Sequence, residues 1–332
     1  MPESRKVQIT GGSTFIVSLP KDWVEKKEIK PGDSLILSPR KDGTIVVSPE
    51  REYEKKANIK ELDITEKDRN SLIRELIGIY MAGYSKIELR AKGNIESELR
   101  RAIMDFTRMV IGPEVIEESN NRVILKDLID PSEFSQKKGL RRMYLIVKNM
   151  HRDAITAFKE NDKGLARDIV QRDKDVDRLF WMITKHYNML LSNPRLVETL
   201  DITGGRSLSY MLVSRAMERI GDHAVRIAEN VINLEDGFKG PLKEEIVEGS
   251  DIAMKILEES ADAFFGEDLQ GLNQAIENRA ELLEKNDELM NQIKQEKKEN
   301  VTPLSYIIES ISRTGSYATD ISEIGINYLM SK

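Results

Sequence analysis

Two pairs of acidic residues have the types and spacing that could bind a metal ion. Glu218 and Asp222 are four residues apart in the strongly helical run 215–230. Asp173 and Asp177 have the same spacing on the helix expected before it. Residues four apart share one helical face, so two such helices can present four carboxylates across a bundle seam, where hard cations bind. We therefore predict a metal site held by these four acids.

An alternative interpretation assigns the acids to ordinary ion pairs, because long helices carry many acidic pairs at this spacing. An ionised carboxylate near a core costs free energy unless it is paired or bound to a metal. Asp173 lies within the apolar stripe of its helix, whereas Glu218 and Asp222 flank the stripe of theirs. The candidate ion-pair partners are Arg172, Arg215, Arg219 and Arg226. His223 also lies on an apolar stripe, which leaves open a core histidine or a metal ligand.

The residue types limit the chemistry further. There is no cysteine, which excludes disulfides, thiolate metal sites and cysteine nucleophiles. With three histidines in 332 residues, a metal site must rely mainly on oxygen ligands. The sequence has no Walker phosphate-binding loop, no His-Glu-x-x-His motif and no Gly-x-Ser-x-Gly motif. We therefore expect a protein that is not an enzyme and has no catalytic residues.

Six long helices are expected after residue 132, because apolar residues recur there at spacings of three and four. Their expected ranges are 135–160, 164–191, 207–234, 243–265, 269–298 and 304–330. The motif Arg219-x-Gly221-x-x-Ala224-x-x-Ile227-x-Glu229 recurs 94 residues later as Arg313-x-Gly315-x-x-Ala318-x-x-Ile321-x-Glu323. Glycine within a helix costs roughly 1 kcal/mol, so its repetition predicts close helix approach. We expect two three-helix bundles, at residues 132–236 and 237–332.

The first 131 residues have a different pattern. Residues 1–50 alternate β-rich runs with turn signals such as Gly11-Gly12 and Asp42-Gly43. This stretch has too few apolar side chains to be stable alone, so we expect it to dimerise. Residues 51–131 are expected to form a compact α/β segment without recognisable chemistry. Its expected elements are helices at 66–82 and 95–110, a strand at 86–90, and a hairpin at 115–126.

The net charge of −6 is unevenly distributed. Residues 1–50 contain 8 Lys+Arg and 7 Asp+Glu, whereas the other 282 residues contain 43 and 50. Most of the chain is therefore a poor partner for nucleic acid, which leaves that function open to residues 1–50 alone. No stretch approaches about 18 consecutive apolar residues, and the N-terminus lacks the pattern of a signal peptide. We expect a cytoplasmic protein that does not insert into a membrane.

The run from Arg215 to Asn230 resembles the signature of PhoU-type phosphate-uptake regulators. The resemblance implies two three-helix bundles and a Glu/Asp-x-x-x-Asp motif, on two helices, that binds an iron or zinc cluster. The residues that match this motif in the first bundle are Asp173, Asp177, Glu218 and Asp222. In the second bundle, the repeat places Ser312 and Ser316 at the corresponding positions. We therefore expect one metal centre rather than two.

The stretch from Arg5 to Pro20, with Ile29–Asp33, resembles a SpoVT/AbrB-type domain, a swapped-hairpin β dimer that usually binds DNA. The fold implied is mainly α: two tandem three-helix bundles preceded by this small β domain and the α/β segment. The resemblance implies a homodimer, with Arg5 and Lys6 as candidate DNA-binding residues.

The two resemblances imply two alternative functions. In the first, the protein regulates phosphate uptake or homeostasis by contact with the phosphate ABC transporter's ATPase or with a sensor kinase. In the alternative, a DNA-binding dimer regulates transcription of phosphate-response genes.

Overall fold

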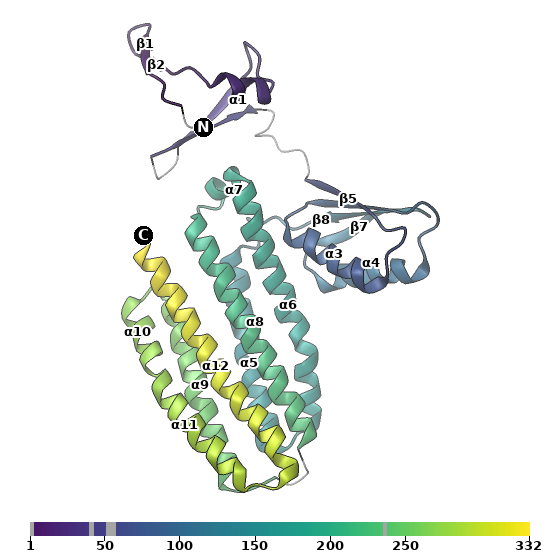
Figure 1. Ribbon diagram of the computed structural model, residues 1–332, viewed down its shortest axis with the longest axis vertical. Coiled ribbons are helices and arrows are strands. Elements are labelled where there is room, and N and C mark those ends of the chain that lie inside the picture. Colours follow the sequence, from purple (N-terminus) through teal and green to yellow (C-terminus); the bar gives the residue numbers. More distant parts are fainter. Residues whose placement is uncertain (1–2, 40–42, 51–57, 235–237) are drawn as a thin grey trace. The chain divides into compact units, whose positions relative to one another are not determined.

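The computed structural model describes residues 3–39, 43–50, 58–234 and 238–332. The chain divides into two compact units, Met1–Asn58 and Ile59–Lys332 (Figure 1). Helices make up 66% of the described residues, which confirms the expected mainly α class with a small N-terminal β domain. None of the described helices combines the length and the apolar character that a membrane span requires.

The first unit contains two hairpins and a short helix. Its described elements are β1 (Gln8–Thr10), β2 (Thr14–Ile16), α1 (Lys21–Lys26), β3 (Leu35–Pro39) and β4 (Ile45–Pro49). β1 pairs with β2, and β3 pairs with β4, both antiparallel. The β1–β2 turn places Gly11 and Gly12 at φ +60° and +85°, where glycine is favoured because it lacks a Cβ. Asp42, expected in the second turn, lies outside the described residues.

The second unit begins with a four-stranded sheet. Its elements are β5 (Ile59–Asp63), α3 (Arg69–Met81), β6 (Lys86–Arg90), α4 (Ser97–Met109), β7 (Pro113–Glu118) and β8 (Arg122–Asp127). The strand order is β5-β6-β8-β7, with β5 parallel to β6 and the other neighbours antiparallel. The sequence pattern does not predict β5, because three of its five residues are charged. Pairing with β6 therefore defines this strand.

Glu88 is the centre of an ion-pair network on the sheet. Its carboxylate accepts hydrogen bonds from Arg122 and Arg90, both at 2.6 Å, and these bonds lower its pKa from 4.5 to about 2. The resulting stabilisation is complete above about pH 4.5 and is lost as the pH falls toward 2. We expect Glu88→Gln to lower the free energy of unfolding by about 1–2 kcal/mol at neutral pH. Urea unfolding should show a smaller loss near pH 2.5, and equal losses at both pH values would contradict this assignment.

The rest of the second unit consists of long helices. They are α5 (Gln136–Glu160), α6 (Lys163–Ser192), α7 (Pro194–Thr199), α8 (Gly204–Asn233), α9 (Pro241–Gly266), α10 (Leu269–Glu277), α11 (Arg279–Gln292) and α12 (Lys298–Met330). α5, α6 and α8 form one bundle, and α9 to α12 form a second beside it (Figure 1). α8 packs along α12, and one hydrophobic core continues through both bundles. The long helices thus form the paired bundles that the repeat predicts.

The short helix α7 was not predicted, and two of the predicted helices differ from the structure by more than a few residues. The fifth expected helix is divided at Asn278, whose side chain donates a hydrogen bond to Glu259 Oε2 at 2.6 Å. The last helix begins before Pro303 rather than after it, because the Asn300 N–H bonds to Lys297 O and starts the first turn upstream. At Asn278, a contact with another helix accompanies the break, whereas the earlier start of α12 rests on a local backbone hydrogen bond.

The two glycines of the repeat lie on faces packed against neighbouring helices. A Cβ at Gly315 would be 2.1 Å from Leu282 Cδ2, so any other residue there would require the Leu282 side chain of α11 to move. A Cβ at Gly221 would be 3.4 Å from Val176 Cγ1, which is close to an ordinary contact. The close approach predicted from the repeat is therefore tighter at Gly315 than at Gly221.

The α/β segment contacts α6 through an ion pair, a hydrogen bond and apolar packing. Lys185 of α6 forms an ion pair with Asp127 of β8, and the two side chains are 1% and 7% exposed. Asn188 Nδ2 donates a hydrogen bond to Met81 O at 2.7 Å, and Trp181 packs against the core of the sheet. α6 therefore joins the sheet to the first bundle.

Candidate metal centre

Four carboxylates lie along the seam between α6 and α8. Asp173 and Asp177, here the α6 pair, come from the middle of α6, and Glu218 and Asp222, the α8 pair, come from the middle of α8. Gly221 borders them, because a Cβ there would be 3.6 Å from Asp173 Oδ1. The spacing of the acids is visible in the sequence, whereas the glycine's place beside them is not.

Two carboxylate oxygens at this seam are buried without a hydrogen bond. In the described part of the chain, Asp173 Oδ1 and Glu218 Oε2 have no hydrogen-bond partner. The Glu218 side chain is 14% exposed, so water relieves little of the cost, and Arg219 Nε lies 3.7 Å from Glu218 Oε2, within ion-pair distance but too far for a hydrogen bond. A buried oxygen left unsatisfied costs about 1–3 kcal/mol, and more when it is charged. Such oxygens are suited to bind a cation.

The four carboxylates have raised pKa values. Burial raises the pKa of Asp177 to about 7, and the charges of its three acidic neighbours add to the effect. Arg215 opposes this rise without cancelling it. Burial is also the first cause of the raised pKa values of Asp173, Glu218 and Asp222. Acids brought together and desolvated in this way mark a candidate functional site.

Arginines partly neutralise the α8 pair. Arg215 Nη1 lies 3.3 Å from Glu218 Oε1, and Arg219 Nη1 lies 3.6 Å from Asp222 Oδ2. The two arginine side chains are 48% and 45% exposed, so these ion pairs add little stability. The alternative drawn from the sequence, that the acids form ordinary ion pairs with arginines, therefore applies to the α8 pair.

The α6 pair has no such partner. Arg172, adjacent to Asp173 in the sequence, pairs with Asp153 instead. Arg226 lies 4.0 Å from Glu309 and not beside the acids. Over the residues that the structure describes, no ion pair to either member of the α6 pair is found. Ion pairing thus leaves the α6 pair, among the described residues, without a cation in direct contact, and Arg215 acts on Asp177 only at longer range.

The side chains do not converge into a finished metal site. Among the described residues, no three histidine, aspartate or glutamate side chains are close enough together to hold a metal ion. Binding would therefore require the carboxylates to rotate toward one another. The donor set still fits a cation that accepts oxygen ligands, because the unsatisfied oxygens come from both helices.

His223 belongs to the packing between α8 and α12. Its Nδ1 lies 3.2 Å from Ser310 Oγ, and its ring is 5.8 Å from the Tyr317 ring. In the second bundle, Ser316 Oγ donates to Ser312 O at 3.1 Å, so hydroxyls occupy the positions that repeat the α8 pair. The acids of the first bundle have no counterpart at these positions.

Arg5 and Lys6 precede β1 in the first unit. Arg5 forms an ion pair with Glu3, whereas Lys6 is exposed. One of the two candidate DNA-binding cations is therefore engaged by an acid of its own segment.

Comparison with known proteins identifies the helical region. Residues 140–231, which contain all four acids, match the PhoU domain. This part of the chain is similar to the PhoU domain family. Residues 8–55 match a second family, described as antidote-toxin recognition MazE, bacterial antitoxin, which agrees with the AbrB-like β domain expected at the N-terminus.

Curated relatives are similar in sequence to part of this chain. The chain is 31% identical over 141 residues to the phosphate-specific transport system accessory protein PhoU homolog of Pseudomonas putida, covering 41% of this chain and 52% of that protein. It is 31% identical over 105 residues to PhoU homolog 1 of Thermotoga maritima, covering 32% of this chain and 43% of that protein. The chain thus spans about half the length of the curated relatives it matches.

Solved structures show the same fold. The crystal structure of the phosphate transport system regulatory protein PhoU from Streptococcus pneumoniae aligns with a TM-score of 0.54 at 20% identity, covering 60% of this chain and 95% of that chain. PhoU from Pseudomonas aeruginosa gives the same score and identity, and the alignment covers 98% of that chain. The two tandem bundles therefore have the PhoU fold.

Proposed function

We propose that this protein is a metal-binding regulator of phosphate uptake that acts by protein–protein contact and not by catalysis. Its PhoU domain and the names of its relatives, which describe accessory and regulatory proteins of phosphate transport, support the regulatory part. The observation that carries the metal part is the seam of four carboxylates, with two buried oxygens that lack hydrogen bonds.

The ligands would be the α6 pair and the α8 pair, with iron or zinc as the cation. The bound cation would supply the positive charge that the buried acids lack. Asp173 and Asp177 would approach it from α6, while Arg215 and Arg219 would stay at the exposed rim and limit the negative charge there. A cation bound by both pairs would link α6 to α8 near the middle of each helix. This link would restrain α6, the helix to which the α/β segment is attached.

The partner would be the phosphate ABC transporter's ATPase or a sensor kinase, and a pull-down tests this. Metal-loaded, full-length protein should retain the phosphate-transport ATPase or a phosphate-responsive kinase of its own organism. Asp177→Asn should weaken retention, whereas Asp175→Asn should not, because Asp175 is an exposed acid on the same helix. If the metal-loaded wild type retains neither partner, the proposed contact is wrong.

The first unit would be the dimerisation domain. Large apolar side chains are exposed on it, namely Val7, Ile9, Phe15, Ile16, Val17, Leu37 and Ile45. Two short hairpins cannot bury this surface alone, and a second copy of the unit would cover it. We expect Phe15→Asp, at a side chain that is 71% exposed, to convert a dimer to a monomer in light-scattering measurements. Ile116→Asp, at an exposed position of β7, is the control that should leave the mass unchanged.

The alternative is DNA binding by the first unit, which the match to the MazE antitoxin family favours. Lys6 and Arg5 would contact phosphates, so the affinity should fall steeply with salt. The full-length Arg5→Gln/Lys6→Gln double variant should lose that salt dependence. Absence of DNA binding by the wild type at low salt would contradict this alternative and leave the regulatory proposal intact.

A further inference from the structure

The surface of α5 carries a dense positive charge. Residues 136–152 of this helix contain six Lys and Arg and no Asp or Glu, in a chain whose net charge is −6. The apolar residues of the same stretch, such as Leu140, Met143 and Val147, are buried in the core of the bundles. The cations remain at the surface, and we call them the basic face of α5: Lys137, Lys138, Arg141, Arg142, Lys148 and Arg152.

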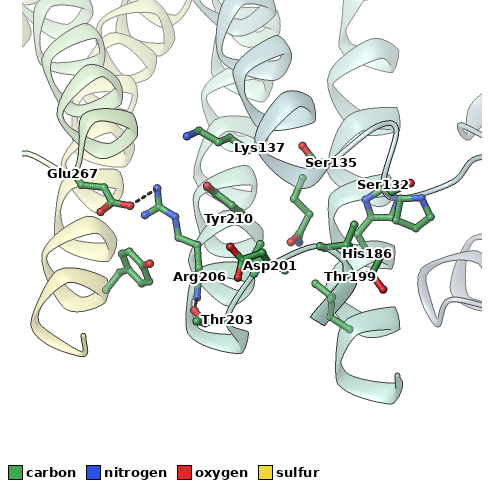
Figure 2. Close-up of a pocket in the computed structure, with 16 residues that line it drawn as sticks. Ser132, Ser135, Lys137, His186, Thr199, Asp201, Thr203, Arg206, Tyr210 and Glu267 are labelled. Carbon is green, nitrogen blue, oxygen red and sulfur yellow. Dashed lines mark hydrogen bonds and ion pairs between the residues drawn. The ribbon is translucent and has the colours of Figure 1, made fainter. Parts of the chain in front are cut away.

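Two of the six cations are neutralised by ion pairs in the described part of the chain. These two, which lie farthest along the helix, both pair with Glu258 of α9, at 3.1 and 2.6 Å. Glu267 lies near the start of α5, but its carboxylate pairs with Arg206 and not with Lys137, as Figure 2 shows. Over the described residues, the four cations in the first two turns of α5 therefore have no ion-pair partner.

These four cations lie where they weaken the helix. Lys137 and Lys138 are in the first turn, where the positive end of the helix macrodipole repels cations. Lys137 and Arg141 are four residues apart, as are Lys138 and Arg142, and like charges at this spacing repel each other. Lys138 also lies three residues after Ser135, the residue that caps the helix, and an acid there would stabilise the helix start. Residues that disfavour the folded helix in this way are typical of a contact outside the chain.

An exposed leucine lies in the middle of the basic face. Leu145 is 57% exposed, and it follows Arg141 and Arg142 by one helical turn, so the three side chains share one side of α5. Tyr144 and Phe265 lie beside them, with ring centres 6.4 Å apart, and the Arg141 guanidinium is 5.1 Å from the centre of the Phe265 ring. Arginine and aromatic side chains are enriched at protein–protein interfaces. The composition of this face is therefore that of a protein contact.

Acids of α9 border the basic face and limit what can bind there. α9 contains seven Asp and Glu against two Lys. Burial raises the pKa of Tyr144 on α5 to about 12, and the charges of Asp262 and Glu258 on α9 add to the effect. A membrane surface or duplex DNA presents negative charge over a wide area, so it would also face these acids and be repelled by them. A protein can confine its acids to a strip that meets α5 alone.

We propose that the basic face of α5 is the docking surface for a narrow acidic strip on the partner protein. This inference rests on the proposed function, because the partner is the ATPase or the sensor kinase named there, and it adds the place and the chemistry of the contact. The unpaired cations attract and orient the carboxylates of the partner, and Leu145 packs against an apolar side chain at the centre. The four acids of the carboxylate seam lie on α6 and α8, so substitutions on α5 leave them unchanged.

Biolayer interferometry tests the docking surface, with the metal-loaded, full-length protein and the purified phosphate-transport ATPase and sensor kinase of its own organism. The wild type should bind one of them, and its association rate should fall as the salt concentration rises. Lys138→Glu/Arg142→Glu should weaken binding by about tenfold or more, because each change replaces an attraction by a repulsion. Without a partner, the same variant should unfold at a temperature no lower than the wild type, because acids are favoured near a helix start.

Lys294→Glu/Lys298→Glu is the matched control, because it reverses two exposed cations four residues apart, between α11 and the start of α12. It should change the affinity by less than about twofold, and equal weakening by both variants would mean attraction to net charge alone. That result would overturn the inference, as would unchanged binding by the α5 variant or a lower unfolding temperature.

Two further ligands separate a protein contact from other anionic surfaces. The wild type and the α5 variant are assayed with vesicles of phosphatidylglycerol and phosphatidylcholine, and with duplex DNA. Wild-type binding to either ligand that is lost in the α5 variant would assign the basic face to a membrane or to nucleic acid and would overturn the inference. If the wild type binds neither the ATPase nor the kinase, the proposed function fails together with it, whereas the other contrary results leave the proposed function intact.

Discussion

Asp127→Asn is expected to lower the free energy of unfolding by about 3–5 kcal/mol, the usual cost of breaking a buried ion pair on one side. Asp127 and Lys185 have side chains that are 7% and 1% exposed. The Lys185 ammonium also lies 4.7 Å from the centre of the Tyr80 ring. Without Asp127, the ammonium would remain buried between the sheet and α6, with the ring as a weak substitute.

Chemical denaturation of the variant and the wild type measures this effect. Asp105→Asn is the matched control, because Asp105 pairs with Arg69 at 2.9 Å on the surface, with both side chains more than one third exposed. Loss of this surface ion pair should lower the free energy of unfolding by less than about 1 kcal/mol. The double change Asp127→Leu/Lys185→Met should recover much of the stability, because it removes both charges together. Similar losses for Asp127→Asn and Asp105→Asn would show that the buried pair does not hold α6 to the sheet.

Asp177→Asn is expected to have opposite effects with and without metal. Without metal, the substitution removes a buried negative charge from among three other acids, so it should stabilise the protein by about 1–2 kcal/mol at pH 7. With metal at about 100 times its dissociation constant, the wild type should gain about 2.7 kcal/mol. The variant should lose that gain because it lacks one ligand.

Asp177 also determines how the stability of the metal-free protein depends on pH. The pKa of Asp177 is raised from 3.8 to about 7 in the folded state. Its contribution to stability is therefore fully present below about pH 3.8 and is lost as the pH rises to 7. In thermal unfolding with a chelator present, Asp177→Asn should become more stable than the wild type as the pH rises across this range. Asp175→Asn should follow the wild type, and a variant less stable than the wild type at pH 7 in chelator would contradict the electrostatic argument.

Much of the helical architecture can be predicted from the sequence, because periodic apolar residues are a local signal. The boundaries of α5, α6 and α8 agree with the expected ones to within a few residues. β5 could not be predicted, since its pairing with β6 is a contact between distant segments. The break at Asn278 also depends on a partner in another helix, Glu259.

The sequence predicts which residues form the candidate metal centre, but it does not predict how their side chains are arranged. The spacing of Asp173, Asp177, Glu218 and Asp222 places each pair on one face of a helix, and the fold brings both pairs to one seam. The sequence offers Arg172, Arg215, Arg219 and Arg226 as partners of the acids, but it does not reveal that only Arg215 and Arg219 pair with them, both on the α8 pair.

Metal analysis tests the carboxylate seam most directly. The full-length wild type, Asp177→Asn and Asp175→Asn are each loaded with iron or zinc, freed of excess metal, and assayed for bound metal per chain by mass spectrometry. We expect at least one ion per chain in the wild type and in Asp175→Asn, and none in Asp177→Asn. A wild type that binds no metal under any loading condition, or an Asp177→Asn variant that binds as much as the wild type, would contradict a metal centre at this seam.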